Sequence, residues 1–427
     1  MTMRDHPLPF FGWRVVAASF VMATFGWGVG FYGPPIFLHA VHAERGWSLP
    51  TVSAAVTVHF LVGAAVVAGL PALHRRFGLS RVTTAGAVAL GLGVLGWSLA
   101  REPWQLFLAT LFSGGGWVTM GAAAVNATVA PWFVADRPKA LSAAYNGASV
   151  GGILFAPLWV GGIEALGFPL AAALIGTAMV AVIGILAARV FAFRPADLGQ
   201  FPDGRAADGS PATAGLAGVR PIPAPVALRP WRDGRFLTLS GGMALGLFAQ
   251  IGLLAHLFSL VVPALGPQGA GLAMSLATGA AIAGRTAFGW LMPAGADRRR
   301  VAAASYLVQL VGSVLLLVAG MQDPMIVLAG IVLFGFGIGN ATSLPPLIAQ
   351  VEFARDDVAR VVALIVAVGQ AGYAFAPAAF GALRALPEPA GGGTAVFAAT
   401  ATIQALAIAV FLAGRRGKPA RLSAQTP

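Results

Sequence analysis

The sequence of 427 residues contains no cysteine, and only 10% of its residues are charged. The absence of cysteine excludes disulfides, thiolate nucleophiles and cysteine-ligated metals. An average soluble chain has about 25% charged residues, so this chain has too few to cover a surface that faces water. No set of carboxylates, histidines or hydroxyls stands at a spacing typical of a catalytic or metal site. We therefore expect neither an enzyme nor a cofactor.

Apolar residues are abundant: they make up 58% of the chain, and the mean hydropathy is +0.81. A helix needs about 20 mainly apolar residues to cross a bilayer. Runs of this length predict an all-α membrane protein with twelve transmembrane helices, at 13–38, 49–73, 82–100, 104–133, 140–163, 168–192, 236–264, 268–292, 301–320, 324–350, 359–383 and 393–413. The first run is too long for the core of a signal peptide and is interpreted as an uncleaved span.

One segment, 193–235, differs in composition, because it is rich in Pro, Gly, Asp and Arg and has no hydrophobic periodicity. It is interpreted as a flexible linker. The linker divides the chain into an N-terminal bundle of six helices at 1–192 and a C-terminal bundle of six at 236–413, followed by a tail at 414–427.

The two halves share short repeats. Asn126-Ala127-Thr128 recurs as Asn340-Ala341-Thr342, and Phe155-Ala156-Pro157 recurs as Phe375-Ala376-Pro377. Repeated halves with a binding site between them are an architecture of transporters.

The positive charges predict the orientation of the chain. With the N-terminus in the cytoplasm, the expected outside loops contain only Arg45, Arg101 and Arg384, and the other Lys and Arg residues fall on the inside, apart from Arg285 within a span. Loops rich in Lys and Arg stay in the cytoplasm. We therefore expect a multi-pass protein of the cytoplasmic (inner) membrane with both termini in the cytoplasm.

Several short motifs resemble those of the major facilitator superfamily, and within it those of the monocarboxylate and oxalate/formate transporters. They are Phe11-Gly12-Trp13, Arg45-Gly46-Trp47-Ser48, Pro131-Trp132-Phe133, Gly284-Arg285 and Phe288-Gly289-Trp290-Leu291. The resemblance extends over nearly the whole chain. It implies the major facilitator fold, with twelve helices in two six-helix bundles, and secondary active transport by alternating access.

The cytoplasmic gate motif of this family is altered. The family pattern Gly-x-x-x-Asp-Arg-x-Gly falls on Pro71, Arg75, Arg76 and Gly78, so an arginine replaces the aspartate. In the second half, Pro293 and Ala294 stand at the Asp and Arg positions, with Asp297 and Arg298 displaced downstream. The resemblance implies a gate made of Arg75, Arg76, Gly78, Asp297 and Arg298.

Arg285 is the one Arg or Lys inside an expected span, and no Asp or Glu lies within any span. A charge at the centre of a membrane helix costs about 2.5–3.5 kcal/mol on insertion scales. A substrate carboxylate would supply the missing negative charge, and the resemblance gives the matching span-8 arginine this role. The alternative is that Arg285 reaches the cytoplasmic interface and binds no substrate.

Other polar residues in the spans are candidates for the transport pathway. His256 and His59 could titrate near neutral pH and couple transport to protons, and His256 could also contact the substrate. Further candidates for the substrate site are Tyr32, Asn126, Gln250, Asn340, Gln370 and Tyr373. Each of these residues could instead serve as a hydrogen-bonded contact between helices.

These observations predict a transporter for a small organic anion, with a monocarboxylate favoured because there is one fixed positive charge. The expected partners are the substrate, the lipid bilayer and a co-transported proton or counter-anion. We expect a monomer that binds no nucleic acid. Two alternatives are an exporter of drug-like or hydrophobic compounds and a membrane sensor that binds a ligand without moving it.

Overall fold

The structure is a computed structural model that describes residues 10–204, 230–292, 296–320, 322–387 and 393–415. Every regular element in these ranges is a helix. Most of the expected central linker (205–229) and most of the tail (416–427) lie outside the described residues.

The first half of the chain contains eight α-helices. They are α1 (Gly12–Gly30), α2 (Gly33–Arg45), α3 (Leu49–Phe77), α4 (Leu79–Leu99), α5 (Pro103–Trp117), α6 (Ala122–Val129), α7 (Arg137–Leu166) and α8 (Phe168–Leu186). Short helical turns lie at η1 (Val118–Met120), η2 (Ala187–Phe191), η3 (Pro195–Leu198) and η4 (Pro202–Gly204).

The second half begins with the short turn η6 (Pro230–Arg232) and contains seven α-helices. They are α9 (Gly234–Leu291), α10 (Arg298–Ala319), α11 (Pro324–Ile338), α12 (Leu344–Glu352), α13 (Arg355–Ala374), α14 (Ala376–Arg384) and α15 (Thr394–Ala413).

Aspartates begin three of the helices in the second half. The carboxylates of Asp233, Asp297 and Asp323 accept backbone N–H groups in the first turns of α9, α10 and α11. A side-chain acceptor at this position pairs N–H groups that have no partner within the helix. Three of the fifteen acidic residues are thus used at the starts of helices.

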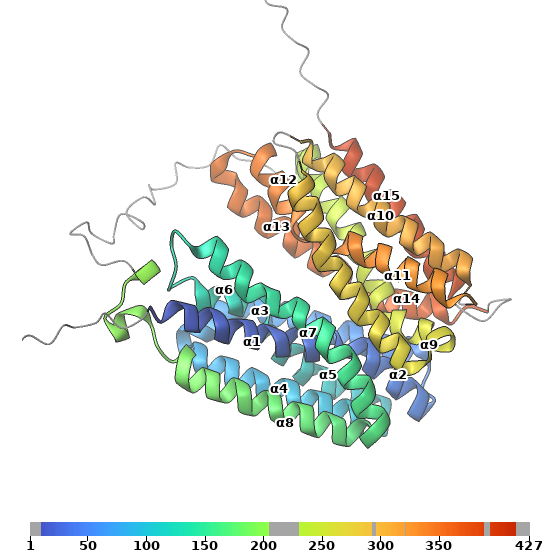
Figure 1. Cartoon of the computed structure of the whole chain (residues 1–427), viewed down its shortest axis with the longest axis horizontal. Coiled ribbons are helices and arrows are strands. Elements are labelled where there is room, and N and C mark those ends of the chain that lie inside the picture. Colours follow the sequence, from blue (N-terminus) through green and yellow to red (C-terminus); the bar gives the residue numbers. More distant parts are fainter. Residues whose placement is uncertain (1–9, 205–229, 293–295, 321, 388–392, 416–427) are drawn as a thin grey trace, which may run out of the picture. The chain divides into compact units, whose positions relative to one another are not determined.

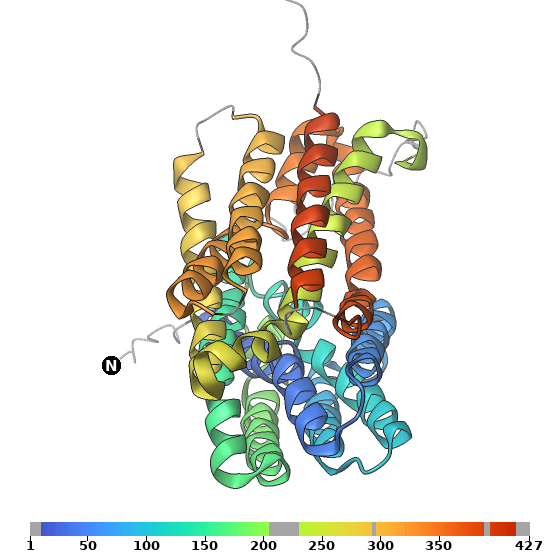
Figure 2. The same ribbon diagram turned by 90° about the vertical axis from the view of Figure 1, so that its right-hand side faces the viewer.

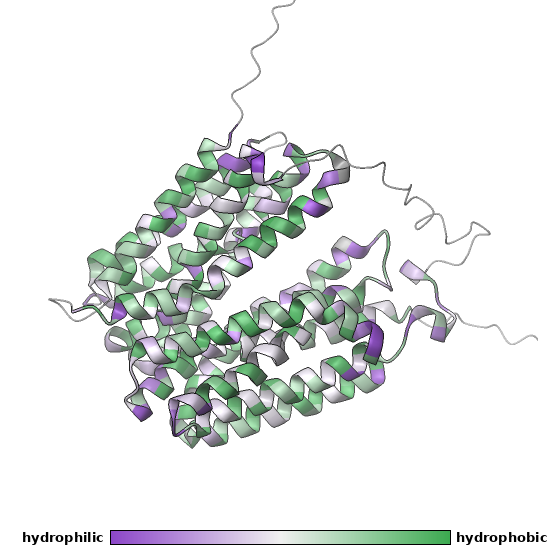
Figure 3. Ribbon diagram, turned by 180° about the vertical axis from the view of Figure 1, so that it is seen from behind, coloured by the Kyte–Doolittle hydropathy of each residue, from purple (hydrophilic) through white to green (hydrophobic). Residues whose placement is uncertain are grey.

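The helices have the length and hydropathy that a membrane requires. Among the described residues, ten helices are long and apolar enough to cross a bilayer. One of them, α9, contains two of the expected spans, separated at Gly266, whose φ is +69°. Figure 3 shows apolar residues along the helices and hydrophilic ones mainly near their ends. A multi-pass membrane protein is confirmed, and the number twelve stays a prediction.

Contacts divide the chain into two compact units. Unit 1 is Met1–Pro221 together with Leu254–Thr278 and Pro377–Pro387, and unit 2 is Ile222–Leu253, Gly279–Ala376 and Glu388–Pro427. The units largely follow the two expected bundles. Unit 1, however, also includes the middle of α9 and most of α14, which belong to the second half of the sequence.

Each unit has an aromatic core. In unit 1, where α1 lies against α7 and α4 against α8 (Figure 1), the Phe37 ring meets those of Trp159 and Phe168 at centroid distances of 4.7 and 5.2 Å. In unit 2, where α10 lies beside α15 (Figure 2), Tyr306 stacks on Phe411 at 5.6 Å. Lipid chains are as apolar as these side chains, so close packing of this kind is what holds membrane helices together.

Candidate substrate site, helix joint and anchors

Four of the expected spans are interrupted. The breaks lie at Phe31–Tyr32 between α1 and α2, at η1 between α5 and α6, at 339–343 between α11 and α12, and at Phe375 between α13 and α14. Interrupted helices expose backbone groups that can hold ligands or ions, and transporters place their sites there. Two of the predicted site residues, Tyr32 and Asn340, lie at such breaks.

Arg285 lies on α9 and is held by the break after α11. Its Nε donates to the carbonyl oxygen of Gly339 at 2.8 Å. The helices are close enough for this bond because glycines stand at the contact. A Cβ added at Gly339 would lie 2.0 Å from the Ala281 carbonyl oxygen, and one at Gly284 would lie 1.8 Å from that of Phe336.

Arg285 is exposed, and none of the ion pairs between described residues involves it. Its Nε is bonded to the backbone, and neither terminal nitrogen has an acidic partner among the described residues. The residue is therefore a fixed cation with a planar pair of donors available.

Asn340 follows directly in the chain. Its side chain is 3% exposed, and its Nδ2 has no hydrogen-bond partner among the described residues. Its carbonyl oxygen accepts N–H groups from Ser343 and Leu344. The turn after α11 therefore brings an unpaired amide donor and the Arg285 anchor into neighbouring positions.

The other predicted site residues of unit 2 lie on α9 and α13. Gln250 is buried, and its Oε1 has no described partner. Gln370 and Tyr373 are half-buried on α13, a helix whose Gly369 approaches Leu247 of α9. No described contact joins these three side chains to Arg285, so their part in the site stays a prediction.

The predicted residues of unit 1 are mostly engaged with neighbouring helices. His59 is buried, with Nδ1 at 2.9 Å from Ser113 Oγ and Nε2 at 2.9 Å from the Gly30 carbonyl oxygen. Asn126 is exposed and donates to Tyr145 Oη, a partner that the sequence analysis did not single out. Both arrangements fit the alternative of a contact between helices.

His256 of α9 contacts the start of α14, which in turn contacts α3 of the first half. These contacts, all within unit 1, are called the joint below. The buried Nε2 of His256 is 3.0 Å from the Pro377 carbonyl oxygen at the start of α14, and Nδ1 has no described partner. One residue further on, the N–H of Ala378 donates to Thr57 Oγ1 of α3 at 3.0 Å. A Cβ added at Gly381 would lie 2.4 Å from the Cβ of Ser53. The start of α14 is thus bonded to α9 and α3.

The predicted gate residues have different surroundings in the two halves. Arg75 and Arg76 are exposed, and Gly78 ends α3 with φ +82°. Arg298 donates to the Leu347 carbonyl oxygen, and Asp297 caps α10 and pairs with Arg415 at 2.7 Å.

Next to the predicted gate residues Asp297 and Arg298 lies an ion pair, between Arg299 and Glu352, that was not predicted from the sequence. The Arg299 side chain is 1% exposed, and its Nε and Nη2 donate to the Glu352 carboxylate at 2.6 and 2.8 Å. The other donors of Arg299 reach Thr238 Oγ1 and the backbone oxygens of Arg235 and Phe411. The sequence signal was an acid, Glu352, two residues after the end of an apolar span.

Two carboxyls at helix starts are held in the charged form. The pKa of Asp233 is lowered, mainly by the hydrogen bond from the Arg235 side chain. Burial alone would raise the pKa of Asp297, but the Arg415 guanidinium and the N–H groups of the first turn of α10 outweigh it, so the pKa is lowered.

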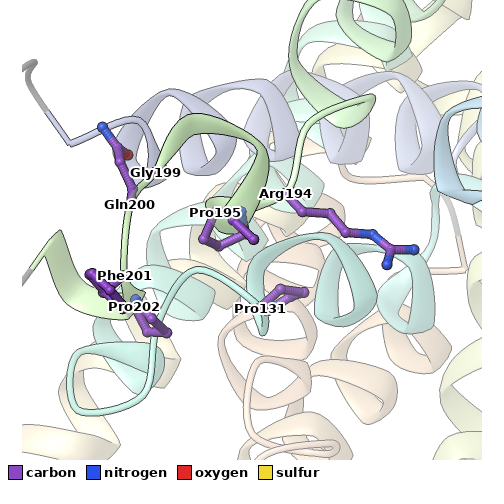
Figure 4. A pocket seen from close by; sticks show the side chains of 8 residues that line it. Pro131, Arg194, Pro195, Gly199, Gln200, Phe201 and Pro202 are labelled. Carbon is purple, nitrogen blue, oxygen red and sulfur yellow. The ribbon is translucent and has the colours of Figure 1, made fainter. Parts of the chain in front are cut away.

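A cavity of about 550 Å³ lies near the start of the linker (Figure 4). Prolines and Phe201 form much of its lining, and Figure 4 shows the Arg194 side chain extending away from them. No metal-ligand cluster occurs in the part of the chain that the structure describes. Neither feature competes with Arg285 as the candidate site.

Interrupted apolar helices and a cation held at a break are features of membrane transporters. The chain belongs to the Major Facilitator Superfamily, whose sequence model matches residues 15–377. A curated relative, MFS-type transporter 1 of Ophiocordyceps sp. (strain BCC 1869), is 26% identical over 358 residues, which cover 80% of this chain and 72% of the relative.

Solved structures share the fold at low sequence identity. The nucleoside transporter NupG is similar with a TM-score of 0.70 and 12% identity, covering 95% of this chain and 98% of NupG. A bacterial homologue of the human lysosomal transporter Spinster, solved in an inward-facing and occupied conformation, gives a TM-score of 0.65 and 14% identity, with 95% and 97% coverage. These likenesses establish the fold.

Proposed function

We propose that this transporter moves a small organic anion, with a monocarboxylate favoured, across the cytoplasmic membrane by alternating access. The proposal includes the expected orientation, with both termini in the cytoplasm. The observation that carries it is the oriented Arg285 side chain, which has no ion-pair partner among the described residues.

The geometry of Arg285 favours a carboxylate. Because Nε is bonded to the Gly339 carbonyl oxygen, the two terminal nitrogens remain as donors in one plane. A carboxylate can accept two parallel hydrogen bonds from such a pair. Because Arg285 is the one Arg or Lys within an expected span, the proposal favours a substrate with a single negative charge.

The unpaired donor of Asn340 favours a substrate that has a second polar group besides the carboxylate. A buried donor without a partner costs about 1–3 kcal/mol, and the Nδ2 of Asn340 is such a donor. We propose that the 2-oxo or 2-hydroxy group of a short acid accepts this N–H. Short 2-oxo and 2-hydroxy acids are therefore the first substrates to test.

The nucleoside transporter among the structural relatives provides a rival. A nucleoside is neutral, so it would leave the charge of Arg285 uncompensated. Drug-like apolar compounds would do the same. We therefore test four compounds: lactate, pyruvate, uridine and a lipophilic cation. Only lactate and pyruvate carry a carboxylate that the Arg285 guanidinium would bind.

The test is uptake of these four compounds into proteoliposomes containing the wild type, Arg285→Lys or Arg285→Gln. We expect uptake of an acid that falls at least tenfold in Arg285→Lys, because lysine lacks the planar donor pair, and to background in Arg285→Gln. Arg300→Gln is the matched control, since the Arg300 side chain is 67% exposed. Unchanged acid uptake in both variants, or uptake of uridine alone, would overturn the proposal.

A further inference from the structure

We infer that residues Pro195–Gly204, at the start of the central linker, form a strap that anchors the turn between α6 and α7 of unit 1. It takes the place of the ion pair that anchors the equivalent turn of unit 2. The strap consists of the protein's own contacts and would form whichever substrate is carried.

The two turns correspond through the internal repeat. Phe133 and Phe353 are separated by 220 residues, the same offset that relates Phe155 to Phe375. Phe133 lies between α6 and α7, and Phe353 lies between α12 and α13. The residue before each phenylalanine differs in charge: Trp132 in the first half and Glu352 in the second.

In unit 2 the turn is held by arginines. The Glu352 carboxylate binds the buried Arg299, and the Glu352 carbonyl oxygen accepts from Arg235 Nη1 at 2.8 Å. Unit 1 cannot form this pair, because Trp132 provides no carboxylate. Accordingly Arg75 and Arg76, in the basic loop of the first half, are exposed.

In unit 1 the linker supplies the missing charge. The backbone N–H of Asp203 donates to the Trp132 carbonyl oxygen at 2.9 Å, the position whose counterpart in unit 2 receives Arg235. The Asp203 carboxylate accepts the N–H groups of Val134, Ala135 and Asp136 at 3.1, 2.9 and 3.2 Å.

The Asp203 carboxylate and the N–H groups of residues 134–136 are chemically suited to each other. Successive N–H groups of a turn that point to one place form a concave site for an anion. Hydrogen bonds to a charged acceptor are stronger than neutral ones. Asp203 has φ +62°, a left-handed conformation that Asp adopts more readily than most residues other than Gly. The conformation directs the backbone N–H and the carboxylate of one residue to the same turn.

The strap also contacts the start of α1. Gln200 Oε1 accepts the N–H of Phe11 at 2.9 Å. The Phe10 ring lies against Gly204 and packs edge-on against Trp132 and Phe133, with centroid distances of 6.2 and 5.4 Å. The strap therefore joins three parts of unit 1: the start of α1, the α6–α7 turn and the end of η2.

Hydrogen exchange of the purified full-length protein tests the strap. We expect the amides of residues 134–136 to exchange slowly in the wild type and roughly tenfold faster in Asp203→Ala, which corresponds to about 1.4 kcal/mol. Asp203→Asn should fall between the two, since it keeps one acceptor and tolerates the left-handed backbone.

Asp197→Asn is the matched control, because the Asp197 carboxylate accepts the N–H of Arg194, directly before the strap, and makes no hydrogen bond to the α6–α7 turn among the described residues. It should leave the exchange of residues 134–136 unchanged. Equal exchange in the wild type and Asp203→Ala would overturn the inference. If Asp203→Ala does not fold, the wild type still decides: fast, unprotected exchange at the Asp203 amide and at residues 134–136 would also overturn it.

Discussion

Two arginines of unit 2 show how differently a guanidinium can be placed in an apolar bundle. All the charge of Arg299 is compensated within the protein, by Glu352 and by backbone oxygens. Arg285 has one backbone oxygen, that of Gly339, which orients it without neutralising it. The first arrangement serves the fold, and the second is the basis of the proposed anion site.

Removing the carboxylate from the Arg299 pair should destabilise the protein. In Glu352→Gln a buried guanidinium loses its counter-charge, and breaking a buried pair in this way costs about 3–5 kcal/mol. We expect a melting temperature lower by several degrees in detergent. Arg300→Gln, in the same arginine run, should change it little, because exposed ion pairs contribute about 0–1 kcal/mol. Equal melting temperatures for Glu352→Gln and the wild type would contradict this assignment.

The orientation of Arg285 depends on the close contact at Gly339. A methyl group there would meet the Ala281 carbonyl oxygen and the Arg285 Cβ at 2.0 and 3.2 Å, so Gly339→Ala should push α9 and α11 apart. We expect KM for the transported acid to rise about tenfold, since a displaced guanidinium loses a charge-assisted hydrogen bond of about 1.5–3 kcal/mol. Gly279→Ala on α9 is the control, because nothing lies within 4 Å of its added Cβ. An unchanged KM in Gly339→Ala would show that the contact does not position Arg285.

At the scale of elements, the interruptions of the helices have identifiable causes. α2 begins with Gly33 and two prolines, and Pro377 stands in the first turn of α14. Proline lacks the N–H that a continuous helix would need and is tolerated in the first turn of a new one. Hydropathy does not reveal these breaks, because the residues on both sides are apolar.

The joint at the start of α14 makes an accessibility experiment possible. Thr57→Val keeps the shape of the side chain but removes the acceptor of the Ala378 N–H. Losing one such bond costs about 0.5–1.5 kcal/mol, so the joint should open about twofold to tenfold more often. Ser53 is fully buried at the joint, and the chain has no cysteine. The single cysteine of Ser53→Cys can therefore react with maleimide only when the joint opens.

We expect maleimide to label Ser53→Cys faster by that factor when Thr57→Val is present. Thr84→Val is the matched control, because the Thr84 hydroxyl donates only to Ser80 of its own helix. A labelling rate that does not respond to Thr57→Val would mean that this hydrogen bond does not hold the joint closed.

At the scale of the whole molecule, composition and run length were sufficient to predict a membrane protein and the location of its apolar helices, and the resemblance of short motifs indicated the superfamily. They also placed Arg285 within a span, because a lone charge stands out against an apolar run. Contacts made by residues distant in sequence were not predictable. Arg299 and Glu352 are separated by 53 positions, and Asp203 and Ala135 by 68, and no periodicity links either pair.

The orientation of the chain is open to a direct measurement. Arg101 and Phe201 are both exposed and are expected on opposite sides of the membrane. Each can be replaced by a single cysteine. In whole cells, an impermeant maleimide should label Arg101→Cys and leave Phe201→Cys unlabelled, and permeabilised cells should show both labelled. The reverse pattern would place the termini outside.

The bond between Arg285 and the Gly339 backbone has an electrical consequence. A backbone carbonyl at the end of a helix carries only a partial negative charge. Under the proposed function the empty site would therefore remain positive, whereas a bound monoanion would bring it close to neutrality. A voltage of 100 mV changes the energy of one elementary charge by about 2.3 kcal/mol. The membrane voltage would then act mainly on the return of the empty carrier, and hardly at all on the step in which the cargo crosses.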